Sequence, residues 1–124
     1  MDVDFDPSDV DLTDFVEDGE KGRKVLRLAY PIEVNITDGS GSHVEEVGHI
    51  EFRRPIARDL DLLDSLASGK AVMAGSRKFV AALVFGDNRI NERKIADMDA
   101  EDMMRAMAVC FGFFQKPSQK TSDQ

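Results

Sequence analysis

The carboxylates at the start of the chain are the first residues whose spacing resembles a chemical site. Asp2, Asp4 and Asp6 alternate as the first ligands of a calcium-binding loop do. Such a loop also needs a glycine at its sixth position and a bidentate glutamate at its twelfth, where this chain has Pro7 and Thr13. We therefore predict no calcium site here.

Two histidines and a pair of glycines are the next candidates. His43 and His49 have no cysteine and no further histidine at metal-ligand spacing, so both are predicted to be solvated polar positions. Gly39 and Gly41 are not followed by the Lys-Ser/Thr pair of a phosphate-binding loop. We predict that these glycines form the tip of a hairpin.

A group of aspartates and the single cysteine complete the candidates. Asp59, Asp61 and Asp64 fall in a predicted helix, but no basic or histidine side chain converges with them in sequence, which favours a solvated face over an acid/base pair. Cys110 lies in an apolar stripe and is predicted to be a buried, inert thiol. Without a nucleophile beside a base, a metal cluster or a phosphate cradle, the sequence predicts a protein that is not an enzyme and has no cofactor or metal.

The charge of the chain is unevenly distributed. The 124 residues have a net charge of -8, but residues 1–20 contain nine acidic and no basic side chains, which leaves 16 basic and 15 acidic ones in the remainder. A nucleic-acid site needs a clustered excess of Lys and Arg, so none is predicted. An acidic N-terminus and the lack of an apolar run of about 18 residues predict no signal peptide and no membrane association, and hence a cytosolic protein.

The ends of the chain are predicted to be flexible. Residues 1–23 mix repelling carboxylates with isolated apolar side chains, which is typical of a disordered acidic leader. The alternative is a linear motif that folds on a partner through Leu12, Phe15 and Val16. A hinge is expected near residues 19–22. Residues 116–124 form a polar tail, which leaves one domain at residues 24–115.

The first part of that domain is predicted to be a β-hairpin. Apolar residues alternate along residues 25–36, which indicates a half-buried strand, and residues 43–54 return as its partner. Pro31 lacks a ladder amide, so the first strand is either an edge strand or broken at this point. The apolar positions of the return strand change parity at Val47, which predicts a bulge near Gly48.

The second part is predicted to be helical. Helices are expected at residues 56–67 and 71–85, a helical turn at 91–96, and a last helix at 99–114 with Asp99 as its N-cap. In the first of these helices Ile56 and Leu60 are expected to face inward. The fold class is therefore α+β: a small antiparallel β-hairpin or meander followed by a three-helix cluster, with a disordered acidic leader and a polar tail.

An apolar stripe along the last helix needs a cover. Met103, Met107, Phe111 and Phe114 recur at helical spacing. Burial in the domain's own core is one interpretation. A partly exposed docking groove is the other, and the flexible methionine side chain suits a surface that fits an irregular partner. Composition and spacing alone support no more than a small binding module.

Four short motifs occur in an order that resembles a known family. They are Tyr-Pro-Ile-Glu-Val at residues 30–34, Glu-Val-Gly-His-Ile-Glu-Phe-Arg-Arg-Pro at 46–55, Ala-Arg-Asp-Leu at 57–60, and an Ile-x-x-Met-x-x-x-Asp run at 95–102. Over residues 28–115 the chain resembles the phage tail assembly chaperone family. The resemblance implies a small protein of the host cytoplasm that binds the tape measure protein before the tail tube polymerises and is absent from the mature virion. A longer, frameshifted form is common in that family.

The resemblance implies a client that is long, helical and apolar. We expect the side chains that cover it to be apolar and adaptable, and self-association through the same side chains stays open. The candidate partner-binding residues are Met103, Met104, Met107, Phe111, Phe113, Phe114, Phe79 and Leu83. Two alternatives remain: a generic adaptor or minor tail structural protein, and an acidic decoy that mimics DNA.

Overall fold

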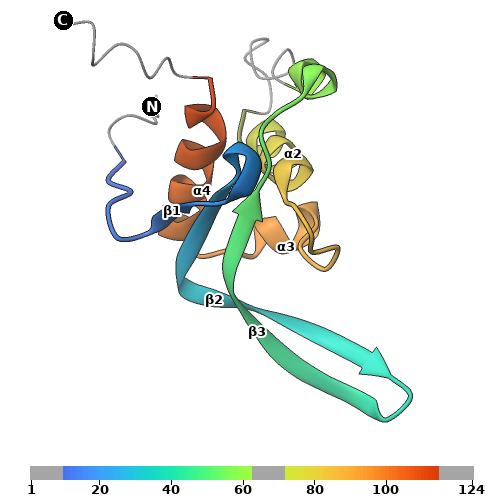
Figure 1. Cartoon of the computed structure of the whole chain (residues 1–124). Helices are drawn as coiled ribbons and strands as arrows, with labels where there is room; N and C mark the ends of the chain where they lie inside the picture. Colours follow the sequence, from blue (N-terminus) through green and yellow to red (C-terminus); the bar gives the residue numbers. More distant parts are fainter. Residues whose placement is uncertain (1–9, 63–71, 115–124) are drawn as a thin grey trace, which may run out of the picture.

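The computed structural model describes residues 10–62 and 72–114. Within these ranges an antiparallel sheet with strand order β1-β2-β3 is followed by helices, so the predicted α+β class is confirmed (Figure 1). The strands are β1 (Val16–Asp18), β2 (Lys24–Asp38) and β3 (Gly41–Phe52), and the helices are α2 (Val72–Leu83), α3 (Glu92–Ala96) and α4 (Ala100–Gly112).

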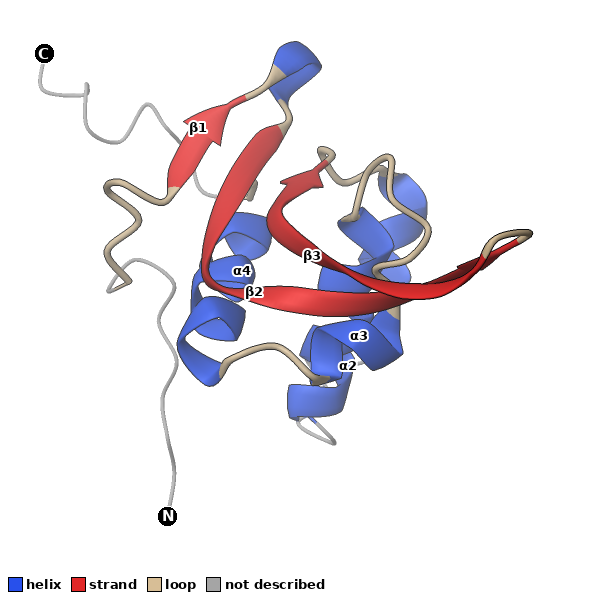
Figure 2. Cartoon of the chain, turned by 90° about the horizontal axis from the view of Figure 1, so that it is seen from below, coloured by secondary structure: helices blue, strands red, loops and turns tan. Residues whose placement is uncertain are grey.

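The strands β2 and β3 form one long hairpin with two parts. Near the ends of the hairpin the helices cover one face of the sheet, as the view from below shows (Figure 2). Residues 33–46 are here called the arm. Val34 at the base of the arm is buried in the core, and the rest of the arm extends away from the helices to the tip (Figure 1). At the tip the amide of Ser40 donates to Asp38 Oδ1 at 2.8 Å, and Gly41 has a φ of 120°, which confirms the predicted glycine turn.

The ladder of the hairpin is interrupted where the arm begins. Arg27 pairs with His49, but the next pair is Ile32 with Val47, so residues 28–31 of β2 lie opposite Gly48 alone. The extra residues are on β2 and not on the return strand, and they allow both Ile50 and Val47 to be buried. Of the two interpretations of Pro31, the division into two short strands is wrong, because β2 continues through Pro31. At this residue β2 is locally an edge, because β1 pairs only with residues 24–26.

The prediction of a flexible leader over residues 1–23 is wrong for residues 10–23. Residues 16–18 form β1 and pair with residues 24–26 of β2, and Leu12 and Phe15 pack against the core with Val16. The expected hinge is a 3₁₀ turn, η2 (Glu20–Gly22), in which Lys21 and Gly22 have φ values of 56° and 78°. The folded domain therefore begins before residue 24. Residues 1–9 and the predicted tail at 116–124 lie outside the described residues.

The first predicted helix is only partly described. Residues 57–59 form a 3₁₀ turn, η3 (Ala57–Asp59), residues 60–62 are helical, and 63–71 lie outside the described residues. Two predictions are wrong at this point. Ile56 and Leu60 are exposed, and Asp59, which was expected to face solvent, is 4% exposed, because Arg53 lies beside it.

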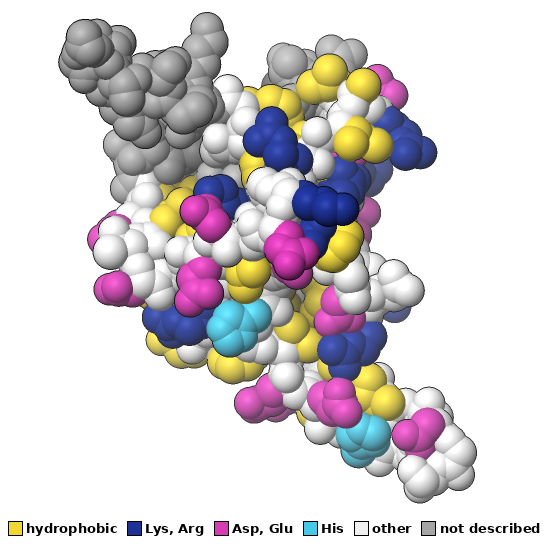
Figure 3. Space-filling model, in the orientation of Figure 1, with side chains coloured by type: hydrophobic (Ala, Val, Ile, Leu, Met, Phe, Trp, Pro, Cys, Tyr) yellow, Lys and Arg dark blue, Asp and Glu magenta, His cyan; other side chains and the backbone are white. Residues whose placement is uncertain are grey.

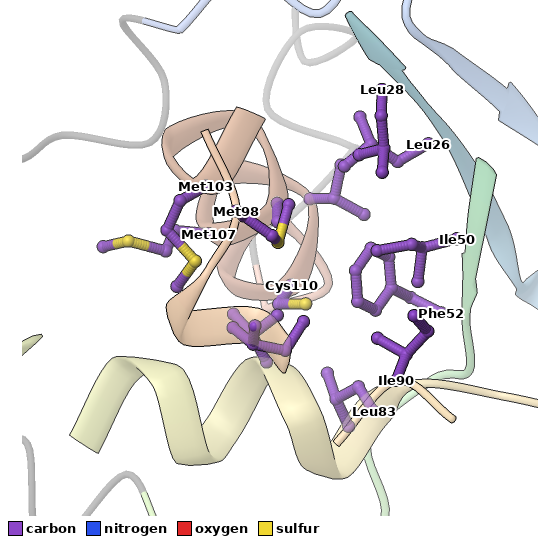
Figure 4. Packing of buried hydrophobic residues seen from close by; sticks show 14 of the residues in the cluster. Leu26, Leu28, Ile50, Phe52, Leu83, Ile90, Met98, Met103, Met107 and Cys110 are labelled. Atoms are coloured by element: carbon purple, nitrogen blue, oxygen red, sulfur yellow. The ribbon is translucent and has the colours of Figure 1, made fainter. Parts of the chain in front are cut away.

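The core lies between the sheet and α2 and α4. Figure 4 shows Met98 and Cys110 on the side of Leu26, Ile50 and Phe52 of the sheet, whereas Met103 and Met107 lie on the other side of α4. The carboxylate of Asp99 accepts from the amides of Glu101 and Asp102, so the predicted N-cap of the last helix is confirmed.

Candidate functional site

The residues predicted to bind a partner fall into two groups. Phe79, Leu83, Met103 and Met107 belong to the core, and none of them is more than 7% exposed. For these four, burial in the domain's own core is the interpretation that the structure supports. A partner cannot contact them while the domain stays folded, because they are buried in the core.

The other four residues reach the surface. Met104 and Phe114 are 45% and 44% exposed, and Phe111 and Phe113 are partly buried. We call these four residues the α4 patch. The patch is anchored on the core, because the ring of Phe79 lies 5.0 Å from that of Phe111 and 6.0 Å from that of Phe114, centroid to centroid. The guanidinium of Arg54 lies 5.9 Å from the centroid of the Phe113 ring.

The most completely buried polar group is the carboxylate of Asp102, which is 0% exposed. The backbone amides of Ala29 and Tyr30 donate to its two oxygens, each at 2.9 Å, and Arg105 Nη2 donates to Oδ1 at 2.9 Å. These two amides belong to the interrupted segment of β2, where no β3 partner is available to them. Asp102 therefore replaces the missing ladder and fixes α4 to the point at which the arm begins.

A second buried carboxylate joins three other segments. Arg53 donates from Nη1 to Asp59 Oδ2 at 2.9 Å and from Nη2 to Oδ1 at 3.2 Å, and Nη2 also donates to the carbonyl of Ala82 at 2.8 Å. The amide of Ile56 donates to Asp59 Oδ2 at 2.7 Å. The Arg53 guanidinium holds the pKa of the Asp59 carboxyl below its ordinary value. The end of β3, the turn η3 and the end of α2 are thus held together.

Sequence reasoning did not assign these two joints. Asp102 was noted as the last residue of the 95–102 run, and Asp59 was predicted to be solvated. A signal for Asp102 exists, because it lies on the same helical face as Ala106, Val109 and Cys110, all buried. An aspartate in line with a buried stripe needs internal partners.

The concave parts of the surface carry little chemistry. One hollow of about 390 Å³ lies beside the start of the arm and another of about 470 Å³ beside the end of α2. Within residues 10–62 and 72–114, no three His, Cys, Asp or Glu side chains are grouped so that they could hold a metal ion. Cys110 is buried, and burial raises the pKa of its thiol well above the ordinary value.

The histidines lie at the surface, on the hairpin. Figure 3 shows one of them on the body and the other on the arm. His43 Nε2 lies 3.0 Å from Glu45 Oε2, both on the arm, and His49 is exposed on β3. Apolar side chains on this face are interspersed with charged ones (Figure 3). Both histidines are polar surface positions, in agreement with the sequence-based prediction.

Comparisons with family models, with curated proteins and with solved structures find no match to this chain. Among the helices of the described residues, none has the length and apolar character needed to cross a bilayer. Function therefore has to be argued from the residues and their geometry.

Proposed function

We propose that this protein is a tail assembly chaperone of a phage or prophage, which binds the tape measure protein in the host cytoplasm and keeps it soluble until the tail tube forms. The proposal is supported by contacts between the motifs on which the family resemblance rests. Segments far apart in the sequence meet at the two buried carboxylates. The motifs are therefore parts of one structural unit.

The contacts of the two carboxylates follow the motifs closely. Asp102 closes the 95–102 run and accepts from the amide of Tyr30, the first residue of the Tyr-Pro-Ile-Glu-Val motif. Asp59, in the Ala-Arg-Asp-Leu motif, pairs with Arg53 of the preceding motif. These contacts join residues of different motifs, so the motifs must occur together for this fold to form. The combination therefore supports the family resemblance more specifically than each short motif does alone.

The α4 patch is the surface on which the client would bind. Fully burying an exposed large apolar side chain contributes about 1.5–3 kcal/mol. The patch residues are already about half buried or more, so the patch supplies only part of the about -8 kcal/mol of a micromolar complex. The rings of Phe111 and Phe114 rest on Phe79, so these two side chains are preorganised at the surface. A complex of this strength is reversible, as release of the client to the growing tube requires.

Co-expression with the tape measure protein, followed by affinity capture of this chain, tests the proposal. The wild-type chain should retain the client in solution. Replacing both Met104 and Phe114 by Ser should weaken retention at least about tenfold, equivalent to 1.4 kcal/mol. The matched control replaces Val44 and Ile56, which are 56% and 47% exposed and lie outside the patch, by Ser. This control should retain the client as the wild type does.

The two failures of this experiment have different meanings. A wild-type chain that does not retain the tape measure protein contradicts the proposed function. A Met104→Ser/Phe114→Ser variant that retains it as well as the Val44→Ser/Ile56→Ser variant contradicts only the assignment of the patch. Detection of the chain in purified virions would favour the alternative of a minor tail structural protein.

One observation bears on the alternative of an acidic DNA mimic. A mimic needs its charge on a rigid surface, and residues 10–18 are folded and contain four carboxylates. However, Asp18 is paired with Lys24, and Arg27 and Arg105 lie against the same segment. The folded part of the leader is thus partly neutralised by the body, which disfavours the imitation of a phosphate backbone.

A further inference from the structure

The N-terminal segment at residues 10–18, here called the strap, lies across the body as an added strand (Figure 1). Its ladder is short. Val16, Glu17 and Asp18 pair with residues 24–26 of β2, and the amide of Arg27 donates to the carbonyl of Phe15 at 2.7 Å. The other neighbour of β2 is the long strand β3. The strap is therefore the least extensively paired part of the sheet.

Phe15 holds the strap together with Leu12 and Val16, which also pack against the core. The Arg105 guanidinium carbon lies 4.0 Å from the centroid of the Phe15 ring, and the guanidinium carbon of Arg27 lies 4.8 Å from it. Arg27 Nη2 also donates to the carbonyl of Asp14 at 3.0 Å. The two guanidinium groups and the adjoining edge of β2 form what we call the seat. Cation–π contact holds an aromatic ring there without a deep apolar pocket.

The seat fits its present occupant imperfectly. A cavity of about 40 Å³ remains beside Phe15 and is lined by side chains that include Val25 and His49. Arg105 Nε is buried and finds no hydrogen-bond acceptor among the residues that the structure describes. This cavity opens at the surface, since Asp14, Glu17 and His49 beside it are exposed. Nearly all buried donors in proteins are paired. The seat thus has room and a free donor for a different ligand.

Charge and backbone conformation also distinguish the strap from the body. Asp11, Asp14, Glu17 and Asp18 give it four negative charges, and the body opposes them with Lys24, Arg27 and Arg105. Asp14 has a φ of 75°, a conformation that is uncommon for a residue other than glycine and carries a modest strain. Attraction by complementary charges is reversible and is weakened by salt.

We propose that the strap is a displaceable intramolecular ligand and that the seat accepts in its place an extended segment of the client. That segment carries an aromatic side chain flanked by acidic residues. It adds to the free edge of β2 as an antiparallel strand, places its ring between Arg27 and Arg105, and supplies an acceptor for Arg105 Nε. The identity of the partner as the client rests on the proposed function, whereas displacement of the strap does not.

A peptide with the sequence of residues 10–18 tests the displacement without any tape measure protein. We would label the peptide with a fluorophore and titrate it with full-length protein, following anisotropy. In the wild type the strap competes for the seat, so binding should be weak. The Phe15→Ala variant loses the aromatic anchor of its own strap and should bind the peptide about tenfold more tightly.

Two controls make the result specific to the seat. Phe85→Ala is matched, because Arg23 lies 4.1 Å from the Phe85 ring, and this pair is outside the seat. That variant should bind the peptide no better than the wild type. The double variant Phe15→Ala/Arg27→Gln should lose the tighter peptide binding expected of Phe15→Ala, because one of the two arginines of the seat is then removed. Equal binding by Phe15→Ala and Phe85→Ala would overturn the proposal, and so would a Phe15→Ala chain that does not fold, since the strap would then be an indispensable part of the domain.

Hydrogen exchange on the wild type provides a second measurement. The amide of Arg27, bonded to Phe15, should exchange at least about tenfold faster than the amides that join β2 and β3, because the strap opens locally. Excess peptide should leave the β2–β3 amides unchanged. Exchange of the Arg27 amide only through global unfolding would contradict a displaceable strap.

Discussion

Asp102 and Asp59 are both buried carboxylates that hold distant segments together, but they do so with different partners. Asp102 accepts from two backbone amides and one arginine, and its side chain is 0% exposed. Asp59 accepts mainly from the guanidinium of Arg53, which is itself 29% exposed, and from one amide. The first replaces part of a sheet, and the second joins the ends of three elements.

The two joints differ in whether water can take the place of the carboxylate when it is lost. If Asp59 is lost, Arg53 can still be hydrated, because part of its side chain is exposed. If Asp102 is lost, the amides of Ala29 and Tyr30 lose their acceptor, and Arg105, whose side chain is 13% exposed, loses its ion-pair partner. A buried donor that loses its acceptor is more unfavourable than an exposed one, so the two joints should contribute unequally to stability.

The largest effect is therefore expected for Asp102→Ala. Removing the acceptor of two amides and of a nearly buried arginine should lower the free energy of unfolding by about 3–5 kcal/mol. Urea denaturation followed by circular dichroism measures it. The matched control is Glu101→Ala, an exposed acidic residue in the same helical turn, which should change the free energy by less than about 0.5 kcal/mol. Similar losses in both variants would show that Asp102 acts only through the helix dipole.

A smaller effect is expected for Asp59→Asn, about 1–3 kcal/mol at neutral pH. The pKa of Asp59 in the folded protein lies below its ordinary value of 3.8, so its contribution is fully present above that value and is lost as the pH falls through the folded-state pKa. Between about pH 5 and pH 3 the stability of Asp59→Asn should thus fall less steeply than that of the wild type. Urea titrations at each pH measure the free energy of unfolding of both proteins. If it depends on pH in the same way for both, Asp59 does not contribute through its lowered pKa.

The smallest effect is expected for Glu45→Gln on the arm. Glu45 pairs with Arg89 at 2.9 Å, but both side chains are more than 40% exposed. Exposed ion pairs contribute between zero and about 1 kcal/mol, so the variant should unfold within about 0.5 kcal/mol of the wild type. A larger decrease in the free energy of unfolding would mean that this ion pair orients the arm. Exposure of the side chains alone would then not decide the order of the three effects.

The features predicted correctly from sequence are those whose causes are local. The glycine turn at the tip and the N-cap at Asp99 each depend on a few neighbouring residues. The role of Asp102 could not be predicted in the same way, because its amide partners lie 72 and 73 residues away. Nothing in the helix pattern shows that a distant strand has lost its ladder.

The strap was missed for an electrostatic reason. Acidic residues repel one another, and a flexible leader follows if only the leader is considered. The body supplies Lys24, Arg27 and Arg105 to this segment, and Phe15 gains its contacts from two of them. The candidate site was predicted only in part for a related reason: periodicity identifies an apolar face, but it does not distinguish side chains such as Met103, covered by the domain itself, from neighbours such as Met104.

The position of Asp102 has a mechanical consequence for the arm. Its carboxylate binds the hairpin at the place where the ladder is interrupted. Beyond this place the base of the arm is held to the body by the buried side chain of Val34 and by the Lys94 and Arg89 side chains. A small rotation of the first turn of α4 is therefore transmitted to the base of a long lever. The tip then sweeps through a larger arc than the helix does, and the direction in which the arm points reports the orientation of α4.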